Sequence, residues 1–194
     1  MLRKLLQRIR SDDRPYALYS QIVAQARQPV FYQTMDISDT AEGRFDMIVL
    51  HVVLVMRRLR AEGAGGRAKA QDLFDLFFAD MDRNLREMGV SDLGVPKRIR
   101  AMVEAFYGRA AVYDAALDAA GAEGLHAALE RNLFAGTPTE DALDRMAAYV
   151  KACEARLAAA PPGDLEAERI AWPDPADTGA DLKPDATREG NESK

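Results

Sequence analysis

The longest apolar stretch of the chain lies between residues 44 and 60, RFDMIVLHVVLVMRRLR. Between positions 45 and 59 only Asp46, His51 and a pair of arginines are polar, and a helix that is apolar on every side is buried on every side. Its most apolar part, residues 47–56, is far shorter than the roughly 20 residues that a bilayer-spanning helix needs. The stretch therefore predicts the central element of a soluble core.

A helix and a buried strand are both compatible with this run, because it is rich in β-branched residues and periodicity alone does not separate the two. Asp39 or Thr40 offers a helix N-cap before the run, and the glycine-rich residues 62–67 offer a turn after it. The length between these signals favours a helix, which we place at residues 44–62.

Apolar residues recur at helical spacing in further segments, each bounded by proline or glycine. The expected helices cover residues 15–28, 68–88, 96–117, 122–134 and 138–159. The link at residues 29–39 is expected to be irregular but to lie against the core, because it is rich in apolar side chains. In the helix at 68–88, the stripe of Phe74, Phe77 and Phe78 predicts core packing rather than a cofactor site.

Single residues in and between these helices carry specific expectations. Gly89 follows the helix at 68–88 as a C′ glycine does, and Thr137 begins a capping box that ends at Glu140 and has proline at the first helical position. Gly108 lies in the middle of a helix, where glycine costs about 1 kcal/mol relative to alanine. We expect it to permit close approach of another helix.

These segments together predict an all-α fold, a single-domain helical bundle of about six to seven helices around the central helix at 44–62. Residues 13–160 form the predicted helical domain. Residues 161–194 hold nine acidic and four basic side chains and are rich in proline and glycine, which predicts an acidic, flexible tail. Local docking of Leu165, Ile170 and Trp172 on the body is the alternative for part of this tail.

Residues 1–12 predict a short basic amphipathic helix that binds a partner or an anionic membrane. The alternative is a first helix docked on the core. The segment lacks the unbroken apolar region of a secretory signal. The predicted partner- or membrane-binding residues are Leu2, Arg3, Lys4, Leu5, Leu6, Arg8 and Ile9, together with the exposed parts of Phe31, Tyr32, Phe106 and Tyr107.

Charge and cysteine usage narrow the class of protein. The net charge of −5 comes from the tail, because residues 1–160 carry equal numbers of acids and bases. A neutral body with one short basic run, residues 97–100, argues against nucleic-acid binding. The chain has a single cysteine, Cys153, which excludes an intrachain disulfide and suits a reducing compartment. We expect Cys153 to pack as a small apolar residue of a late helix.

Catalytic and metal-binding motifs are missing. The two histidines, His51 and His126, have no partner at ligand spacing, and the sequence holds no phosphate-binding glycine loop and no nucleophile elbow. His51 lies in the most buried run and is expected to be a neutral core histidine that hydrogen-bonds a neighbouring side chain or carbonyl. We therefore expect no enzyme, no cofactor, no metal and no small-molecule substrate.

Several motifs, in order over about residues 15–120, resemble the ubiquinol–cytochrome c chaperone family, the assembly factors of the cytochrome bc1 complex. The features that carry the resemblance are Pro15–Tyr19, Phe31-Tyr32, Phe45-Asp46-Met47, Leu50-His51, Arg58-Leu59-Arg60, Leu73-Phe74, Phe78, Met81, Leu85–Asp92, Val95, Lys97, Phe106–Arg109 and Tyr113.

The resemblance implies a non-enzymatic helical chaperone that binds newly made cytochrome b, or another bc1 subunit, at the membrane surface. The chain starts only fourteen residues before the matching leader, without a long targeting extension, so we expect an alphaproteobacterial-type, cytoplasmic member with peripheral contact at the inner face of the cytoplasmic membrane. A helical adaptor or regulatory module that binds a soluble protein is the alternative function.

Overall fold

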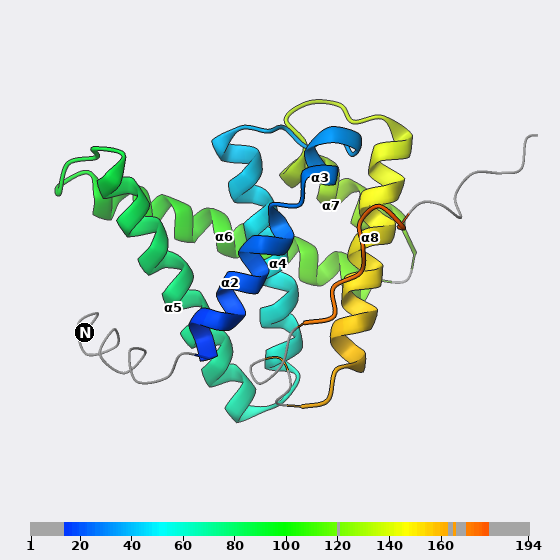
Figure 1. The fold of residues 1–194 in the computed structure, drawn as a ribbon, viewed down its shortest axis with the longest axis horizontal. Coiled ribbons are helices and arrows are strands. Elements are labelled where there is room, and N and C mark those ends of the chain that lie inside the picture. The colour runs from blue at the N-terminus through cyan, green and yellow to red at the C-terminus, as the bar shows by residue number, and fades with distance from the viewer. Residues whose placement is uncertain (1–13, 120, 163–164, 166–169, 179–194) are drawn as a thin grey trace, which may run out of the picture.

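The computed structural model describes residues 14–119, 121–162, 165 and 170–178, and every regular element among them is an α-helix (Figure 1). The helices are α2 (Arg14–Ala26), α3 (Pro29–Thr34), α4 (Ala41–Arg60), α5 (Ala64–Glu87), α6 (Val95–Asp118), α7 (Glu123–Leu133) and α8 (Glu140–Ala159). The predicted all-α bundle is confirmed. Residues 1–13, which include the predicted N-terminal helix, lie outside the described residues.

Helix α4 is the centre of the bundle and contacts α2, α5, α6, α7 and α8 (Figure 1). All ten side chains from residue 47 to residue 56 are buried. Full burial of an aliphatic side chain contributes about 1.5–3 kcal/mol, so this helix supplies much of the apolar free energy of the fold. Its N-cap is Thr40, whose hydroxyl accepts a hydrogen bond from the Gly43 amide at 3.1 Å. The helix begins at Ala41, three residues before the predicted start.

Aromatic side chains join α5 to α6 and α4. The rings of Phe74, Phe77 and Phe78 all pack against Phe106 of α6, with centroids 5.4, 5.9 and 5.8 Å from it. The ring of Phe45 in α4 stacks on Phe77 at 5.8 Å. The three phenylalanines of α5 are buried, which confirms that the stripe is core.

The link predicted as irregular contains a short helix. Pro29 occupies the first turn of α3, where its fixed φ suits the helix and its missing N–H leaves no donor unpaired. The rest of the link covers the core as expected, because Met35 and Ile37 are buried and the Ile37 amide donates to the Phe31 carbonyl at 3.3 Å.

Two helix starts also differ from the prediction. Helix α5 begins at Ala64, so Gly66 belongs to its first turn rather than to a loop. A Cβ at this glycine would lie 1.9 Å from the Leu59 carbonyl oxygen, so a residue without a side chain is needed where α4 and α5 meet. Helix α8 is capped by Thr139, whose hydroxyl accepts from the Ala142 amide at 3.2 Å, and not by Thr137.

Two glycines of the α5–α6 region give opposite outcomes. Gly89 ends α5 with φ of +80°, the left-handed conformation of a C′ glycine, as predicted. The predicted role of Gly108 is wrong, because no described atom lies within 4 Å of a Cβ added there. This glycine faces open space in α6.

None of the helices in the described residues is long and apolar enough to cross a membrane.

Candidate functional site

A chain of buried polar groups crosses the centre of the bundle. His51 of α4 lies with Nδ1 2.8 Å from the Met47 carbonyl oxygen and Nε2 2.7 Å from the Tyr149 hydroxyl of α8. The Gln25 side-chain amide of α2 donates to the same hydroxyl at 3.0 Å. Because a carbonyl only accepts, Nδ1 of His51 carries the proton, and Nε2 then accepts from Tyr149. Each polar group in the chain thus has a partner.

The surroundings of His51 keep its imidazole neutral. Its side chain is fully buried, and burial lowers the pKa of His51 to about 4. Three neutral rings pack around it, those of Phe31, Tyr149 and Trp172, with centroids 5.3–5.9 Å away. Burial also raises the pKa of the Tyr149 hydroxyl. The prediction of a neutral, hydrogen-bonded core histidine is confirmed.

Hydrogen bonds from α2 also reach part of the segment predicted to be a flexible tail. The Gln25 amide donates to the Pro173 carbonyl at 3.3 Å, and the Ile170 amide donates to the side-chain oxygen of Gln21 at 2.7 Å. Leu165 and Ile170 are buried, and the Trp172 ring lies on His51. Residues 170–178, coloured orange to red in Figure 1, run between α4 and α8. The local docking considered for this segment is present.

Arg57 of α4 is surrounded by carboxylates. Its guanidinium pairs with Glu154 of α8 at 3.1 Å and with Asp114 and Asp118 of α6, and the hydrogen bond to Asp118 is the main cause of its raised pKa. A hollow of about 340 Å³ beside it lies between α4 and α8 and is mostly apolar. Since the acids neutralise Arg57, the hollow offers little free charge to a ligand.

Arg58 of α4 forms hydrogen bonds with the C-terminal end of α8. It donates to the carbonyls of Leu157 and Ala160 at 2.7 and 2.6 Å and pairs with Glu62 at 2.8 Å. The two charged side chains are only 12% and 9% exposed. This ion pair is structural, because both of its members are used inside the bundle.

A second hollow, of about 330 Å³, lies where α2, α3 and α4 meet. Tyr32 lines it, and its hydroxyl donates to the Ala26 carbonyl at 2.8 Å. Arg27 and Arg44 also line it, and Arg44 pairs with Asp39 at 2.6 Å. Tyr32 is thus half-buried, with its polar end already occupied.

The predicted partner-binding residues are not all at the surface. Phe31 and Phe106 are 0% and 1% exposed and belong to the core, whereas Tyr107 is 54% exposed. In each aromatic pair the tyrosine is therefore the more accessible member, with Tyr107 exposed and Tyr32 half-buried. The seven residues from Leu2 to Ile9 precede the part of the chain that the structure describes.

Sequence reasoning missed Met88 and Leu93, which are 72% and 92% exposed and are the two most exposed large apolar side chains among the described residues. Both lie in the connection between α5 and α6. Their signal was present in the sequence, because an apolar residue in a short glycine-, serine- and aspartate-rich connection has few neighbours to pack against.

The described residues contain no group of three or more histidine, cysteine or acidic side chains placed to hold a metal ion. Cys153 is buried, and burial raises the pKa of its thiol to about 12. Among the large apolar side chains, Met88, Leu93 and Tyr107 remain exposed.

Comparisons with known proteins agree with one another. The family model for the ubiquinol-cytochrome C chaperone matches residues 33–172. A crystal structure of the Cbp3 homolog from Brucella abortus superposes with a TM-score of 0.76 at 37% identity, covering 92% of this chain and 99% of that one. Ubiquinol-cytochrome-c reductase complex assembly factor 1 of Xenopus laevis and of Mus musculus are each 26% identical over 117 residues, 60% of this chain. This match covers 58% of the Xenopus protein and 39% of the mouse protein.

Proposed function

The chain belongs to the ubiquinol–cytochrome c chaperone family, and from this premise we propose that it is an assembly chaperone of the cytochrome bc1 complex. In this role it binds newly made cytochrome b, or another bc1 subunit, at the membrane surface and aids maturation of the complex. The observation that carries the proposal is the family match over residues 33–172, supported by the near-complete structural match to the Cbp3 homolog.

The structure supports a binding role because some large apolar side chains are not packed into the core. The deeply buried polar groups, His51 and Gln25, are engaged within the bundle, and large apolar side chains such as Leu93 stay in water. Contiguous exposed apolar patches with polar residues around them are typical of surfaces that bind proteins or membranes. We propose, as part of the same role, that the protein resides in the cytoplasm and makes peripheral contact with the membrane.

The proposal is tested by pull-down of the tagged full chain from gently solubilised membranes of the source cell, with bound proteins identified by mass spectrometry. Recovery of cytochrome b or other bc1 subunits well above a tag-only control is expected. Recovery of soluble proteins alone would refute the assembly role and favour a helical adaptor.

The contribution of residues 1–12 is tested separately. Leu5→Asp with Leu6→Asp is expected to weaken capture of the client or sedimentation with anionic liposomes, because it removes apolar area from the amphipathic face. Gln7→Asp with Ser11→Asp adds the same two charges outside the apolar positions and serves as the matched control. Circular dichroism checks that helicity is kept. Equal binding by both double variants would rule out a role for the apolar face.

A further inference from the structure

The end of the α5–α6 hairpin, residues 82–100, is here called the tip. We propose that the tip docks on an anionic lipid bilayer. The tip is distinct in sequence from residues 1–12, and it would give the proposed assembly chaperone a further point of contact with the membrane. The inference extends the proposed function but does not depend on which client is bound.

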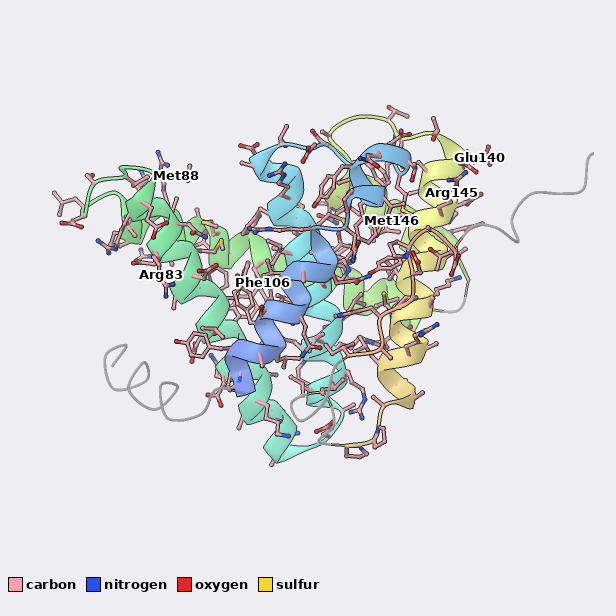
Figure 2. All side chains as sticks on the ribbon, viewed as in Figure 1. Arg83, Met88, Phe106, Glu140, Arg145 and Met146 are labelled. Carbon is pink, nitrogen blue, oxygen red and sulfur yellow. The ribbon has the colours of Figure 1, made fainter. Side chains whose placement is uncertain are left out.

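The tip presents apolar side chains to water at one end of the molecule. In the part of the chain that the structure describes, Leu93 and Met88 are the most exposed of the large apolar residues, whereas the flanking Val95 is buried at the start of α6. Figure 1 shows the connection between α5 and α6 at the left edge of the molecule, on the side away from α8, and Figure 2 places Met88 there. The two side chains therefore lie where a flat partner can reach them.

Hydrogen bonds hold the connection in this shape. After Gly89 the Val90 amide donates to the Leu85 carbonyl at 3.0 Å, as in a Schellman motif. Arg86 pairs with Asp82 in its own helix and with Asp92 in the connection. The exposure of Leu93 is thus built into an ordered turn.

The charge of the tip complements an anionic surface. The chain as a whole carries −5, yet the tip has more bases than acids, five against three. The bases are Arg83, Arg86, Lys97, Arg98 and Arg100, and the acids are Asp82, Glu87 and Asp92. Within the described residues Lys97, Arg98 and Arg100 have no ion-pair partner, while Arg86 is shared between Asp82 and Asp92 and Arg83 pairs with Asp80. Free cations therefore flank Leu93 from the first turns of α6.

A bilayer fits this shape better than a protein does. A stable protein interface buries about 1,200–2,000 Å² in total and seats its anchors in pockets. The hollows beside Arg57 and Tyr32 lie in other parts of the described structure. A projecting turn with two apolar side chains needs no pocket in a bilayer, because the side chains enter the acyl boundary while the cations stay at the headgroups.

A fluorophore at the tip reports docking directly. The sole native cysteine, Cys153, is buried, so Leu93→Cys can be labelled selectively with nitrobenzoxadiazole in the full chain. Vesicles of phosphatidylglycerol and phosphatidylcholine are expected to shift the emission to the blue, and phosphatidylcholine alone is not. Ala155→Cys, an exposed position of α8, is the matched control and should not respond. Nitroxide lipids should quench the probe at position 93.

The basic flank is tested with Lys97→Ala and Arg98→Ala. Each charge removed is expected to weaken vesicle binding of the tip probe roughly fivefold at low salt, and high salt should remove most of the difference. Lys151→Ala on exposed α8 is the control with the same charge change. An equal effect of all three substitutions would mean that net charge, not the tip, governs binding, and would overturn the proposal.

The outcomes separate this inference from the assembly role. No blue shift at position 93 while the protein sediments with the vesicles would overturn docking through the tip. A probe that responds to solubilised bc1 subunits but not to vesicles would also overturn it and would make the tip a protein-binding surface. Pull-down of bc1 subunits tests the assembly role independently, because it is done in detergent without a bilayer.

Discussion

Lowering the pH from 7 to 5 is expected to destabilise the fold through His51. Burial lowers its pKa to about 4, whereas an unfolded histidine titrates near its ordinary value of 6.5. Between these values the unfolded chain binds a proton that the folded chain does not, so stability is lost as the pH falls below 6.5. At pH 5 the linkage relation gives a loss of about 2 kcal/mol relative to pH 7.

The loss is measured by urea unfolding, followed by circular dichroism at pH 7 and pH 5. His51→Gln removes the titrating group, so the difference between the two pH values should shrink by about 2 kcal/mol, whatever the stability of the variant at pH 7. His126→Gln changes the other histidine, which lies nearer the surface beside Asp144, and is expected to keep the steep fall.

A fall of the same size in His51→Gln as in the wild type would refute this reasoning. Nuclear magnetic resonance of the imidazole carbons offers a second route if the variant does not fold. The His51 signal should remain that of a neutral ring with a proton on Nδ1 down to pH 5, because that nitrogen donates to the Met47 carbonyl. Protonation of His51 near pH 6.5 in the folded protein would contradict the proposed cause.

The remaining predictions concern packing and hydrogen bonds, and each is checked by chemical unfolding. Gly108→Ala should stabilise the protein by about 1 kcal/mol, because α6 is open there. Gly66→Ala should destabilise it, because the new Cβ would meet the Leu59 carbonyl, and the opposite order of stabilities would refute the packing argument. Tyr149→Phe should cost about 1–3 kcal/mol, because Nε2 of His51 loses its donor, and a neutral result would mean that the bond contributes little. Arg58→Ala should cost about 3–5 kcal/mol, because it leaves the Glu62 carboxylate buried and unpaired, and adding Glu62→Gln should restore part of the loss.

The central helix and its cap were predictable because their signals are local. The run at residues 47–56 has no polar face, which indicates a helix buried on all sides. Thr40 can serve as its N-cap regardless of how the helix packs, because the cap is a local hydrogen bond. The environment of His51 followed from its place in that run. Its partner did not, because Tyr149 lies 98 residues away and only tertiary packing brings it to 2.7 Å.

Predictions failed where sterics between elements decide the outcome. Gly108 is predicted to permit close approach of another helix but faces open space, whereas Gly66, predicted to lie in a turn, is where α4 and α5 come too close for a side chain. The start of α8 was misplaced because Thr137 and Thr139 both suit an N-cap, and only Thr139 reaches Asp36, whose carboxylate accepts its hydroxyl at 2.8 Å. Exposure of Leu93 likewise depends on how far the hairpin extends beyond its neighbours.

The buried polar chain explains why one histidine interrupts the most apolar helix. An aliphatic residue in place of His51 would pack against α8 in several similar registers, whereas the imidazole accepts a hydrogen bond from Tyr149 in one. The same hydroxyl accepts from Gln25, whose second N–H reaches Pro173, so α2, α4, α8 and the tail segment share one alignment. A slip of any element would leave a buried polar group unpaired, at a cost of about 1–3 kcal/mol. Among packings that bury similar apolar area, the hydrogen bonds of these polar groups therefore favour a single one. They fix α2, α4 and α8 relative to one another and do not involve the tip.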